Sequence, residues 1–298
     1  MKIVIAGGSG FIGEPLVRNL LPRGDVVVLS RDPSKVRAGR GVAWSPRESG
    51  GAWRDEVASA DVIINLAGEN IGAGRWTAAR RQRMIDSRVE ATRALVDVMR
   101  AVPRARTFIS ASAVGYYGSR GDEELDERAG AGKGFLVDVT RRWEDEAHRA
   151  DDVARVIILR FGVVLAADGG ALAKMLLPFR LGVGGVIGSG TQWMPWVDRD
   201  DVIRFIEWSI DREDARAVYN VAAPSAVTNR EFTKALASAL HRPAIFPLPA
   251  FVLRIVFGEM ADETLLTSER VVPARGVAEG FTFSYGDVES SLRHALGR

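Results

Sequence analysis

The segment Lys2-Ile3-Val4-Ile5-Ala6-Gly7-Gly8-Ser9-Gly10-Phe11-Ile12-Gly13 decides the fold class of this chain. Its first part, Lys2–Ala6, is a short apolar run rich in β-branched residues, which is typical of a buried strand. A glycine-rich turn follows, and the residues from Phe11 to Leu21 have the pattern of a helix. This succession of strand, glycine turn and helix is typical of a turn that binds the phosphates of a dinucleotide.

The spacing of the glycines gives each of them a physical role. Gly7 or Gly8 can form the tight turn, and Gly10 lets the backbone approach a pyrophosphate. Gly13 lets the helix pack closely on the strand, while the helix start offers N–H groups and a positive dipole to the phosphates. The alternative is a glycine-rich turn that binds nothing. The contacts predicted for the turn are Gly7, Gly10, Phe11, Ile12 and Gly13.

Short strands and amphipathic helices continue to alternate through the first two-thirds of the chain. The expected strands are Lys2–Ala6, Asp25–Ser30, Asp61–Leu66, Arg106–Ser110, Arg155–Leu159 and Ala217–Val221. The expected helices between them are Phe11–Leu21, Thr77–Ala101, Phe135–Ala150, Leu172–Leu181 and Asp200–Asp211. This alternation predicts a parallel sheet that is covered by helices on both faces.

The rhythm changes near residue 223, where helical segments begin to follow one another. They are expected over Asn229–Leu240, Pro249–Phe257, Asp262–Ser268 and Gly286–Leu296. The sequence therefore predicts an α/β fold: a Rossmann-type doubly wound sheet in residues 1–222 and a smaller, mostly helical substrate-side domain in residues 223–298. An insertion at about residues 168–198 is expected to close the cleft between them.

The end of the second strand favours NADP over NAD as the cofactor. A site for NAD usually has an acidic residue there, which holds the ribose 2′-hydroxyl. Ser30 stands at this position and Arg31 follows it, and a hydroxyl with a guanidinium suits a 2′-phosphate. Asp32 is the opposing observation. We interpret Asp32 as an N-cap before Pro33, an arrangement that helix starts favour.

Composition excludes several other classes of protein. The 298 residues contain no cysteine, which rules out thiolate metal sites, cysteine nucleophiles and disulfides. The 40 Lys and Arg residues nearly balance 38 Asp and Glu residues, so a nucleic-acid partner has only one Arg-rich helix to support it. The three histidines (His148, His241 and His294) lie at no metal-ligand spacing, and no metal site is expected. Without a signal-peptide pattern or a long apolar run, we expect a cytoplasmic chain with no membrane partner.

Five further segments carry a resemblance to a known family. They are Asn65-Leu66-Ala67-Gly68-Glu69-Asn70, Ser87-Arg88, Trp143-Glu144, Leu177-Pro178-Phe179-Arg180-Leu181-Gly182 and Gly188-Ser189-Gly190-Thr191-Gln192-Trp193. With the glycine turn, the chain resembles the extended short-chain dehydrogenase/reductases, and more closely their atypical epimerase family branch (the 39U type). The resemblance runs nearly end to end and includes the C-terminal helical domain after Leu248. It implies NADP binding, with no particular substrate or reaction.

The resemblance also implies where the cofactor lies. Ser30 and Arg31 match the positions that hold the adenosine ribose phosphate. Arg83 precedes Arg88 by about 1.4 helical turns and would project partly to the same side, and for these two arginines a solvated helix face is the alternative. The other implied contacts, from the adenine to the nicotinamide, are Leu66, Ala67, Gly68, Arg88 and Val164.

One part of the family pattern is missing from this chain. Short-chain dehydrogenases use a Tyr whose pKa is lowered by a Lys four residues on, with a Ser upstream. Ser112 matches that Ser, but Leu136 and Thr140 stand where the Tyr and the Lys would be. Tyr116 or Tyr117 could replace the lost acid, and the alternative is that both tyrosines only pack the loop against the sheet. These three residues, Ser112, Tyr116 and Tyr117, are the catalytic candidates.

Polar and aromatic residues are expected on the other side of the cleft. The candidates for binding a substrate are Arg180, Gln192, Trp193 and Trp196. The alternative for the two tryptophans is packing between segments.

Two functions follow from these observations. The first is an NADP-binding epimerase or oxidoreductase that acts on an unidentified small molecule. The second is a non-catalytic NADP(H) sensor or interaction protein. The missing Tyr and Lys favour the sensor, whereas the nicotinamide-side residues and the aromatic cleft favour the enzyme. The sequence carries no signal for an oligomeric state.

Overall fold

The predicted strands form one parallel sheet in the computed structural model, which describes residues 1–48, 50–104 and 106–298. Within these residues the sheet has seven strands in the order β11-β7-β5-β4-β1-β2-β3. Their bounds are β1 Lys2–Ala6, β2 Asp25–Ser30, β3 Arg40–Ala43, β4 Val62–Asn65, β5 Thr107–Ala113, β7 Arg155–Phe161 and β11 Val218–Val221. The strand order reverses between β1 and β4, and a ligand crevice opens at such a point in doubly wound folds. The predicted fold class is confirmed.

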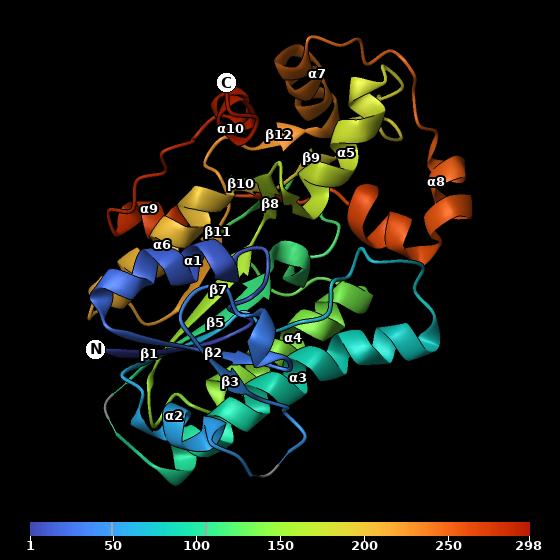
Figure 1. Ribbon diagram of the computed structural model, residues 1–298. Coiled ribbons are helices and arrows are strands. Elements are labelled where there is room, and N and C mark those ends of the chain that lie inside the picture. The colour runs from blue at the N-terminus through green and yellow to red at the C-terminus, as the bar shows by residue number, and fades with distance from the viewer. Residues whose placement is uncertain (49, 105) are drawn as a thin grey trace.

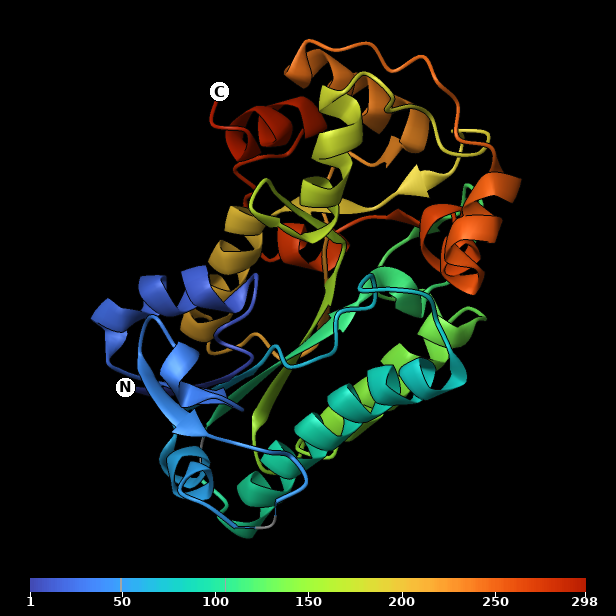
Figure 2. The same ribbon diagram turned by 45° about the vertical axis from the view of Figure 1, so that its right-hand side comes forward.

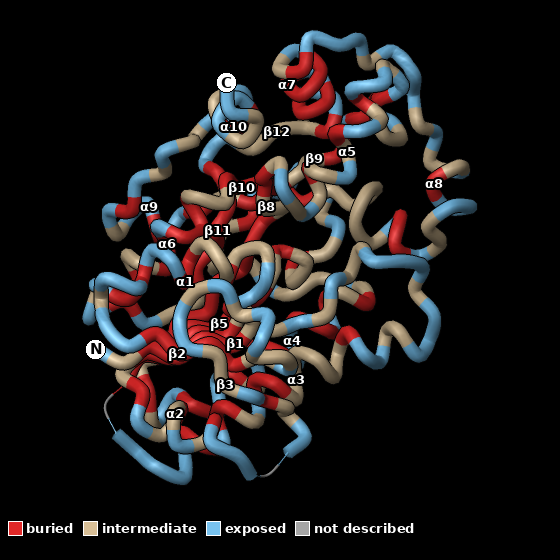
Figure 3. The backbone as a smooth tube through the Cα atoms, in the orientation of Figure 1, coloured by how far each residue is buried: buried red, intermediate tan, exposed pale blue. Residues whose placement is uncertain are grey.

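Helices cover both faces of the sheet (Figure 1). One face carries α1 (Gly13–Leu20) and α6 (Arg199–Asp211). The other carries α2 (Trp53–Ser59), α3 (Ala78–Ala101) and α4 (Phe135–His148), and α3 and α4 lie side by side in Figure 2. Successive β1 residues alternate between the two cores because side chains of a strand point to opposite faces. The central strands β1, β4, β5 and β7 are therefore almost wholly buried (Figure 3).

A separate core holds the C-terminal region together. It is formed by α5 (Gly170–Arg180), α7 (Asn229–Leu240) and α10 (Val288–Ala295), which gather beside β8 (Val163–Ala166) and β10 (Trp196–Asp198) in both Figure 1 and Figure 2. The remaining elements are β6 Glu124–Leu125, β9 Trp193–Met194, β12 Val227–Thr228, α8 Ala250–Phe257, β13 Arg270–Val271 and α9 Ala274–Ala278. In the described part of the chain, no helix is both long enough and apolar enough to cross a membrane. A cytoplasmic location stays a prediction.

Some local expectations are confirmed and others are not. Asp32 accepts a hydrogen bond from the backbone N–H of Ser34 and caps a short helical turn, as predicted. Thr228 forms a capping box with Glu231 at the start of α7. The helix expected over Asp262–Ser268 is found only in part: a π-helix covers Ala261–Leu265, and β13 follows at Arg270. The sequence analysis also missed β3 and α2, because neither has an apolar run long enough to show a period.

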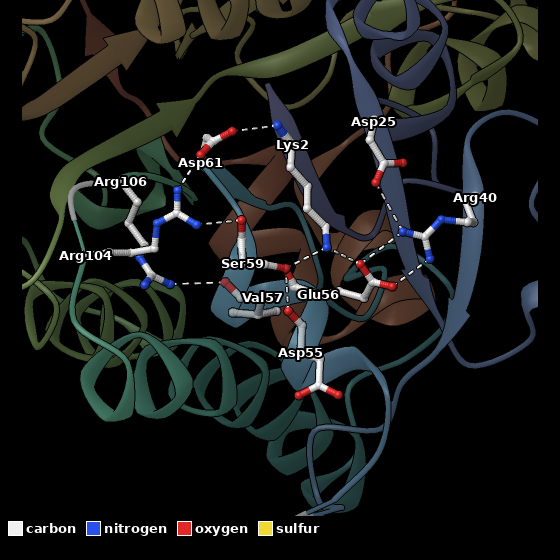
Figure 4. Close-up of polar contacts among 10 residues, drawn as sticks. All are labelled: Lys2, Asp25, Arg40, Asp55, Glu56, Val57, Ser59, Asp61, Arg104 and Arg106. Atoms are coloured by element: carbon white, nitrogen blue, oxygen red, sulfur yellow. Dashed lines mark hydrogen bonds and ion pairs between the residues drawn. The ribbon is translucent and has the colours of Figure 1, made fainter.

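Exposed ion pairs tie together the amino ends of the strands (Figure 4). Arg40 from β3 pairs with Glu56 of α2 (2.6 Å) and with Asp25 of β2 (3.3 Å), and Lys2 of β1 also pairs with Glu56 (2.5 Å). Asp61, just before β4, accepts a hydrogen bond from the Lys2 backbone N–H (2.7 Å). We call these residues, with Arg104, the amino-edge network. It lies at the edge of the sheet opposite the glycine turn.

Candidate cofactor and substrate site

The glycine turn is built to keep its outer side open. Gly7 has a φ of +81°, and a Cβ there would come within 2.7 Å of the Leu66 backbone at the end of β4. A Cβ at Gly13 would lie 2.3 Å from the Gly7 carbonyl oxygen. Both glycines are therefore needed for close packing. Gly10 differs, because it is exposed and a Cβ there would meet only the Gly7 carbonyl oxygen, at 3.2 Å. The space above Gly10 fits a ligand such as a pyrophosphate.

The start of α1 fits the same ligand. Ile12 occupies the N-cap position and gives no side-chain cap. The Glu14 N–H donates to the Gly10 carbonyl oxygen (2.9 Å) and Pro15 has no N–H, so the Gly13 N–H is the first-turn donor that faces an anion. The Phe11 ring packs on the insertion, where a Cβ on Gly169 would lie 2.4 Å from it, and the Arg199 guanidinium lies 5.1 Å from its centroid. The turn is thus held against the segment that was expected to close the cleft.

At the end of β2, Arg31 is exposed, whereas Asp32 forms its hydrogen bonds within the turn that follows. Ser30 Oγ donates to the Asp32 carbonyl oxygen (3.0 Å) and accepts from the Asp32 backbone N–H (3.2 Å). Hydrogen bonds from Ser34 and Lys35 lower the pKa of Asp32. Its carboxylate therefore caps the turn. The presence of Asp32 is then no argument against a 2′-phosphate beside Ser30 and Arg31.

The structure separates the two arginines of α3. The guanidinium of Arg88 donates to the carbonyl oxygens of Glu69 (3.1 Å) and Met84 (3.1 Å), and a Cβ on Gly68 would lie 3.1 Å from its Cζ. Burial lowers the pKa of Arg88 to about 10. Arg83 is exposed and pairs with the Glu69 carboxylate (3.3 Å). Arg88 thus lies against the predicted Leu66–Gly68 segment, and Arg83 lies on a solvated helix face.

A buried polar network spans the carboxyl ends of three neighbouring strands. Ser112 of β5, Arg160 of β7 and Asn220 of β11 stand at one register position. Arg160 donates two hydrogen bonds to the Glu144 carboxylate of α4 (2.8 and 2.7 Å) and one to the Tyr117 hydroxyl (3.0 Å). We call these five residues the carboxyl-edge network. The sequence analysis found three of its members but could not pair them, because the register of the strands brings them together.

The hydroxyl hydrogens of two catalytic candidates, Ser112 and Tyr117, are donated within this network. Ser112 Oγ donates to Glu144 (2.6 Å), and the Tyr117 hydroxyl donates to Asn220 Oδ1 (2.7 Å). Tyr117 is 0% exposed, and burial raises its pKa to about 12. Tyr116 is half-buried, and its ring face lies 3.4 Å from the Arg160 guanidinium. Tyr117 therefore supports the loop, whereas the Tyr116 hydroxyl forms no hydrogen bond among the residues that the structure describes.

The substrate-side candidates occupy four different environments. Trp196 is 1% exposed, packs in the C-terminal core and donates to the Ser225 carbonyl oxygen. This is the packing alternative given for it above. Gln192 is buried and donates to the carbonyl oxygens of Ile187 and Leu265 (both 3.1 Å). Trp193 is half-buried and donates to Asp122 (2.8 Å). Arg180 is exposed at the end of α5.

A cavity of about 420 Å³ lies beside this segment. Its lining includes Asp122, Gln192, Arg254, Leu266 and Ser268. Four of these five residues were missed by the sequence analysis, since they come from α8 and from separate loops without a motif. Because Gln192 is among the lining residues, the cavity lies on the predicted substrate side.

One polar cluster brings His294 of α10 to two aspartates at the start of α6. Oxygens of Asp198 and Asp200 and a nitrogen of His294 lie within 4.8 Å of one another. Asp198 already accepts hydrogen bonds from the Asp200 backbone N–H (2.9 Å) and from Ser291 Oγ (2.8 Å). His294 pairs with Asp200 (2.9 Å). These contacts dock α10 onto the start of α6.

The sheet order, the open glycine turn and the helical C-terminal region define a Rossmann-type dinucleotide-binding protein. Comparison with protein-family models specifies it further: residues 3–222 match the NAD dependent epimerase/dehydratase family, and residues 248–295 match a domain of unknown function, DUF1731. The chain belongs to this epimerase family, and the predicted resemblance is confirmed.

Relatives in distant organisms cover the whole chain. An epimerase family protein of Mycobacterium leprae is 36% identical over 99% of this chain and 96% of its own length. The human epimerase family protein SDR39U1 is 35% identical over 99% of this chain and 100% of its own. The crystal structure of human SDR39U1 (isoform 2) with NADPH matches with a TM-score of 0.89 and 33% identity, over all of both chains. The cofactor in that structure is the one that Ser30 and Arg31 predict here.

Proposed function

We propose that this chain is an NADPH-binding oxidoreductase or epimerase-like enzyme that acts on a small molecule. The open side of the glycine turn, above the uncapped start of α1, is the observation that carries the proposal. Residues 1–222 hold the cofactor and residues 223–298 form the substrate side. Bound NADPH supplies a hydride to the substrate.

Each part of the cofactor has residues that fit it. The glycine turn and the N–H group at the very start of α1 hold the pyrophosphate, and Ser30 with the exposed Arg31 hold the ribose 2′-phosphate. The residues that line the path toward the nicotinamide are Leu66, Ala67, Gly68, Arg88 and Val164. The crystal structure of human SDR39U1 with NADPH supports the choice of this cofactor.

A cofactor-binding titration tests the proposal. We expect NADPH to bind more tightly than NADH, and Arg31→Asp to weaken NADPH selectively by about 1.5–3 kcal/mol, the value of a lost charge-assisted hydrogen bond. Gly10→Val should abolish binding of both cofactors and leave the fold intact, because its side chain enters space that only a ligand uses. Equal affinities for NADPH and NADH in the wild-type protein would overturn the NADP assignment.

A non-catalytic NADPH sensor is the second candidate. It is favoured by Leu136 and Thr140, which replace the usual Tyr and Lys, and by the Ser112 hydrogen already donated to Glu144. Turnover distinguishes the two candidates. An enzyme oxidises NADPH when a carbonyl compound fits the cleft, whereas a sensor binds NADPH and oxidises none.

A further inference from the structure

Helix α8 exposes the apolar side that a helix of a folded protein normally turns toward a core. Of its residues, Ala250–Phe257, only Leu253 is buried (Figure 3). Phe251 and Ile255 lie four residues apart and share one side of the helix, and Val256 follows them. All three side chains are more than half exposed. This outer side of α8 therefore meets no core in the described part of the chain.

Two neighbouring segments extend this exposed apolar surface. Leu248, just before α8, accepts a hydrogen bond from the Gly188 backbone N–H (2.9 Å) and donates one to the Val186 carbonyl oxygen (2.8 Å). The chain that enters α8 thus runs beside the chain that leaves α5. The connection from α7 to α8 follows the outer margin of the molecule in both Figure 1 and Figure 2.

The large apolar side chains of these elements form what we call the apolar patch. They are 51–72% exposed, and they are Leu177, Leu181, Val183, Ile245, Phe246, Phe251, Ile255 and Val256. Twelve large apolar side chains are exposed among the described residues, and these eight are two-thirds of them. Such a concentration of exposed apolar side chains marks an interaction site.

The charges that accompany the apolar patch have one sign. Residues 171–188 and 241–258, which carry the patch, contain four Lys and Arg residues and no Asp or Glu, although the whole chain has 40 and 38 of the two kinds. The two exposed acids that follow α8 are already paired, Asp262 with Arg254 (2.9 Å) and Glu259 with Arg81 (2.8 Å). Three exposed basic side chains form no ion pair with any described residue: Lys174, Arg180 and Arg242.

Apolar side chains among unpaired positive charges fit the surface of an anionic membrane. The apolar groups can enter the boundary between headgroups and acyl chains, while lysine and arginine attract the anionic headgroups. A second copy of this chain fits less well, because a two-fold contact through the patch would bring the same positive charges of both copies together. Surface binding also needs no spanning helix. The expectation of no membrane partner rested on the lack of a long apolar run, whereas the patch is assembled from separate segments.

We propose that the apolar patch docks this protein on the surface of an anionic membrane. The outer side of α8, with Ile245 and Phe246 before it, enters the boundary between headgroups and acyl chains. The three unpaired basic side chains bind the anionic headgroups. This docking goes beyond the proposed function and needs neither NADPH nor a substrate, so either one can fail without the other.

Co-sedimentation of the full chain with vesicles tests the positive charges. The wild-type protein should bind vesicles of phosphatidylcholine and phosphatidylglycerol at least about 10-fold more tightly than vesicles of phosphatidylcholine alone, because several basic residues act together at an anionic surface. Arg242→Glu should weaken this binding by about 10-fold or more. Arg216→Glu is the matched control: it makes the same charge change at an exposed arginine just before β11 and should keep most of the binding. Binding to neither kind of vesicle, or equal losses in the two variants, would overturn the proposal.

A fluorescent label tests whether the apolar side chains enter the lipid. The chain has no cysteine, so a single introduced cysteine can carry the environment-sensitive dye NBD. The dye on Ile255→Cys should brighten and shift to shorter wavelength when phosphatidylglycerol vesicles are added, because the site moves from water into the interface. Val277→Cys, at an exposed valine of α9 outside the patch, is the matched control and should not respond. No response at Ile255→Cys would overturn the docking of the patch.

Sedimentation velocity without lipid tests the other occupant, a second copy of the chain. We expect a monomer, or a dimer that Ile255→Asp does not dissociate, and either result leaves the patch open to lipid. A dimer that Ile255→Asp separates into monomers would overturn the proposal, since the patch would then join two copies.

Discussion

The two edges of the sheet carry polar networks of opposite character. At the amino edge, Arg40 is half-exposed in its pairs with Glu56 and Asp25. At the carboxyl edge, the side chains of Arg160 and Glu144 are only 5% and 6% exposed. Both networks join several strands, and both pair arginine with carboxylates. They differ in how much water competes for the charges.

Burial decides what each network can do. An exposed pair gains little, because water and salt screen it and because two long side chains must be ordered. A buried pair gains little over apolar packing, but it costs much when one partner is removed. The carboxyl-edge network therefore fixes geometry: it sets the position of the Ser112 hydroxyl and the Tyr116 ring beside the proposed cofactor site. The amino-edge network only adds a small increment of stability.

The largest contrast is expected between Arg160→Met and Arg40→Met. Arg160→Met leaves the Glu144 charge buried without its partner and should lower the free energy of unfolding by about 3–5 kcal/mol. Arg40→Met should lower it by about 1 kcal/mol or less. Urea unfolding at pH 7 measures both values.

A double variant tests whether the stability lost in Arg160→Met comes from the unpaired Glu144 charge or from lost packing. In Arg160→Met with Glu144→Gln the uncompensated charge is gone, so part of the lost stability should return. No recovery, or equal losses for Arg160→Met and Arg40→Met, would show that the charge is not what makes the buried network costly.

Glu269 and Glu56 sharpen the comparison, because their pKa values move in opposite directions. Glu269 is buried just before β13, and burial raises its pKa in the folded state from 4.5 to about 8. The unfolded chain releases that proton first, so this group lowers the stability of the wild-type protein as pH rises from about 4.5 to about 8. Glu269→Gln should be as stable as wild type at pH 4 and more stable at pH 7, by roughly 3 kcal/mol. Melting curves over this pH range measure the difference, and parallel curves for the two proteins would contradict it.

The same contrast explains what could be predicted from the sequence. The glycine turn and strands β1 and β2 have local signals, so Lys2–Ala6 and Asp25–Ser30 were predicted to the residue. The carboxyl-edge network depends on register, which aligns Ser112 with Arg160 across two strands that are distant in sequence. No local pattern reports such a pairing.

Glu269 and the cavity escaped prediction for a related reason. Glu269 has no motif around it, and its raised pKa comes from burial and from Glu263 rather than from its own residue type. Trp196 was left open between a ligand surface and packing, and the C-terminal core uses it for packing.

A smaller effect is expected within the buried network, from Tyr117→Phe. It leaves a donor on Arg160 and an acceptor on Asn220 without their shared partner, which should cost about 1–3 kcal/mol. Tyr116→Phe is the matched control, because its ring face over Arg160 is kept, and it should change stability by less than about 0.5 kcal/mol. Equal losses in urea unfolding would remove the distinction between the two tyrosines.

The smallest effect is expected at the amino edge, from Glu56→Gln. Hydrogen bonds from Arg40 and Lys2 lower the pKa of Glu56 from 4.5 to about 2. A lowered pKa adds stability that is present above pH 4.5 and is lost as pH falls toward 2. Because the Arg40 side chain is half-exposed, screening leaves about 1 kcal/mol of this contribution at pH 7. Glu56→Gln should therefore destabilise the protein by about that amount in low salt, and by less in 1 M NaCl, where exposed charges are screened. Urea unfolding at the two salt concentrations, with Arg160→Met as the buried reference, measures it. A loss that does not change with salt would mean that the amino-edge network behaves like the buried one.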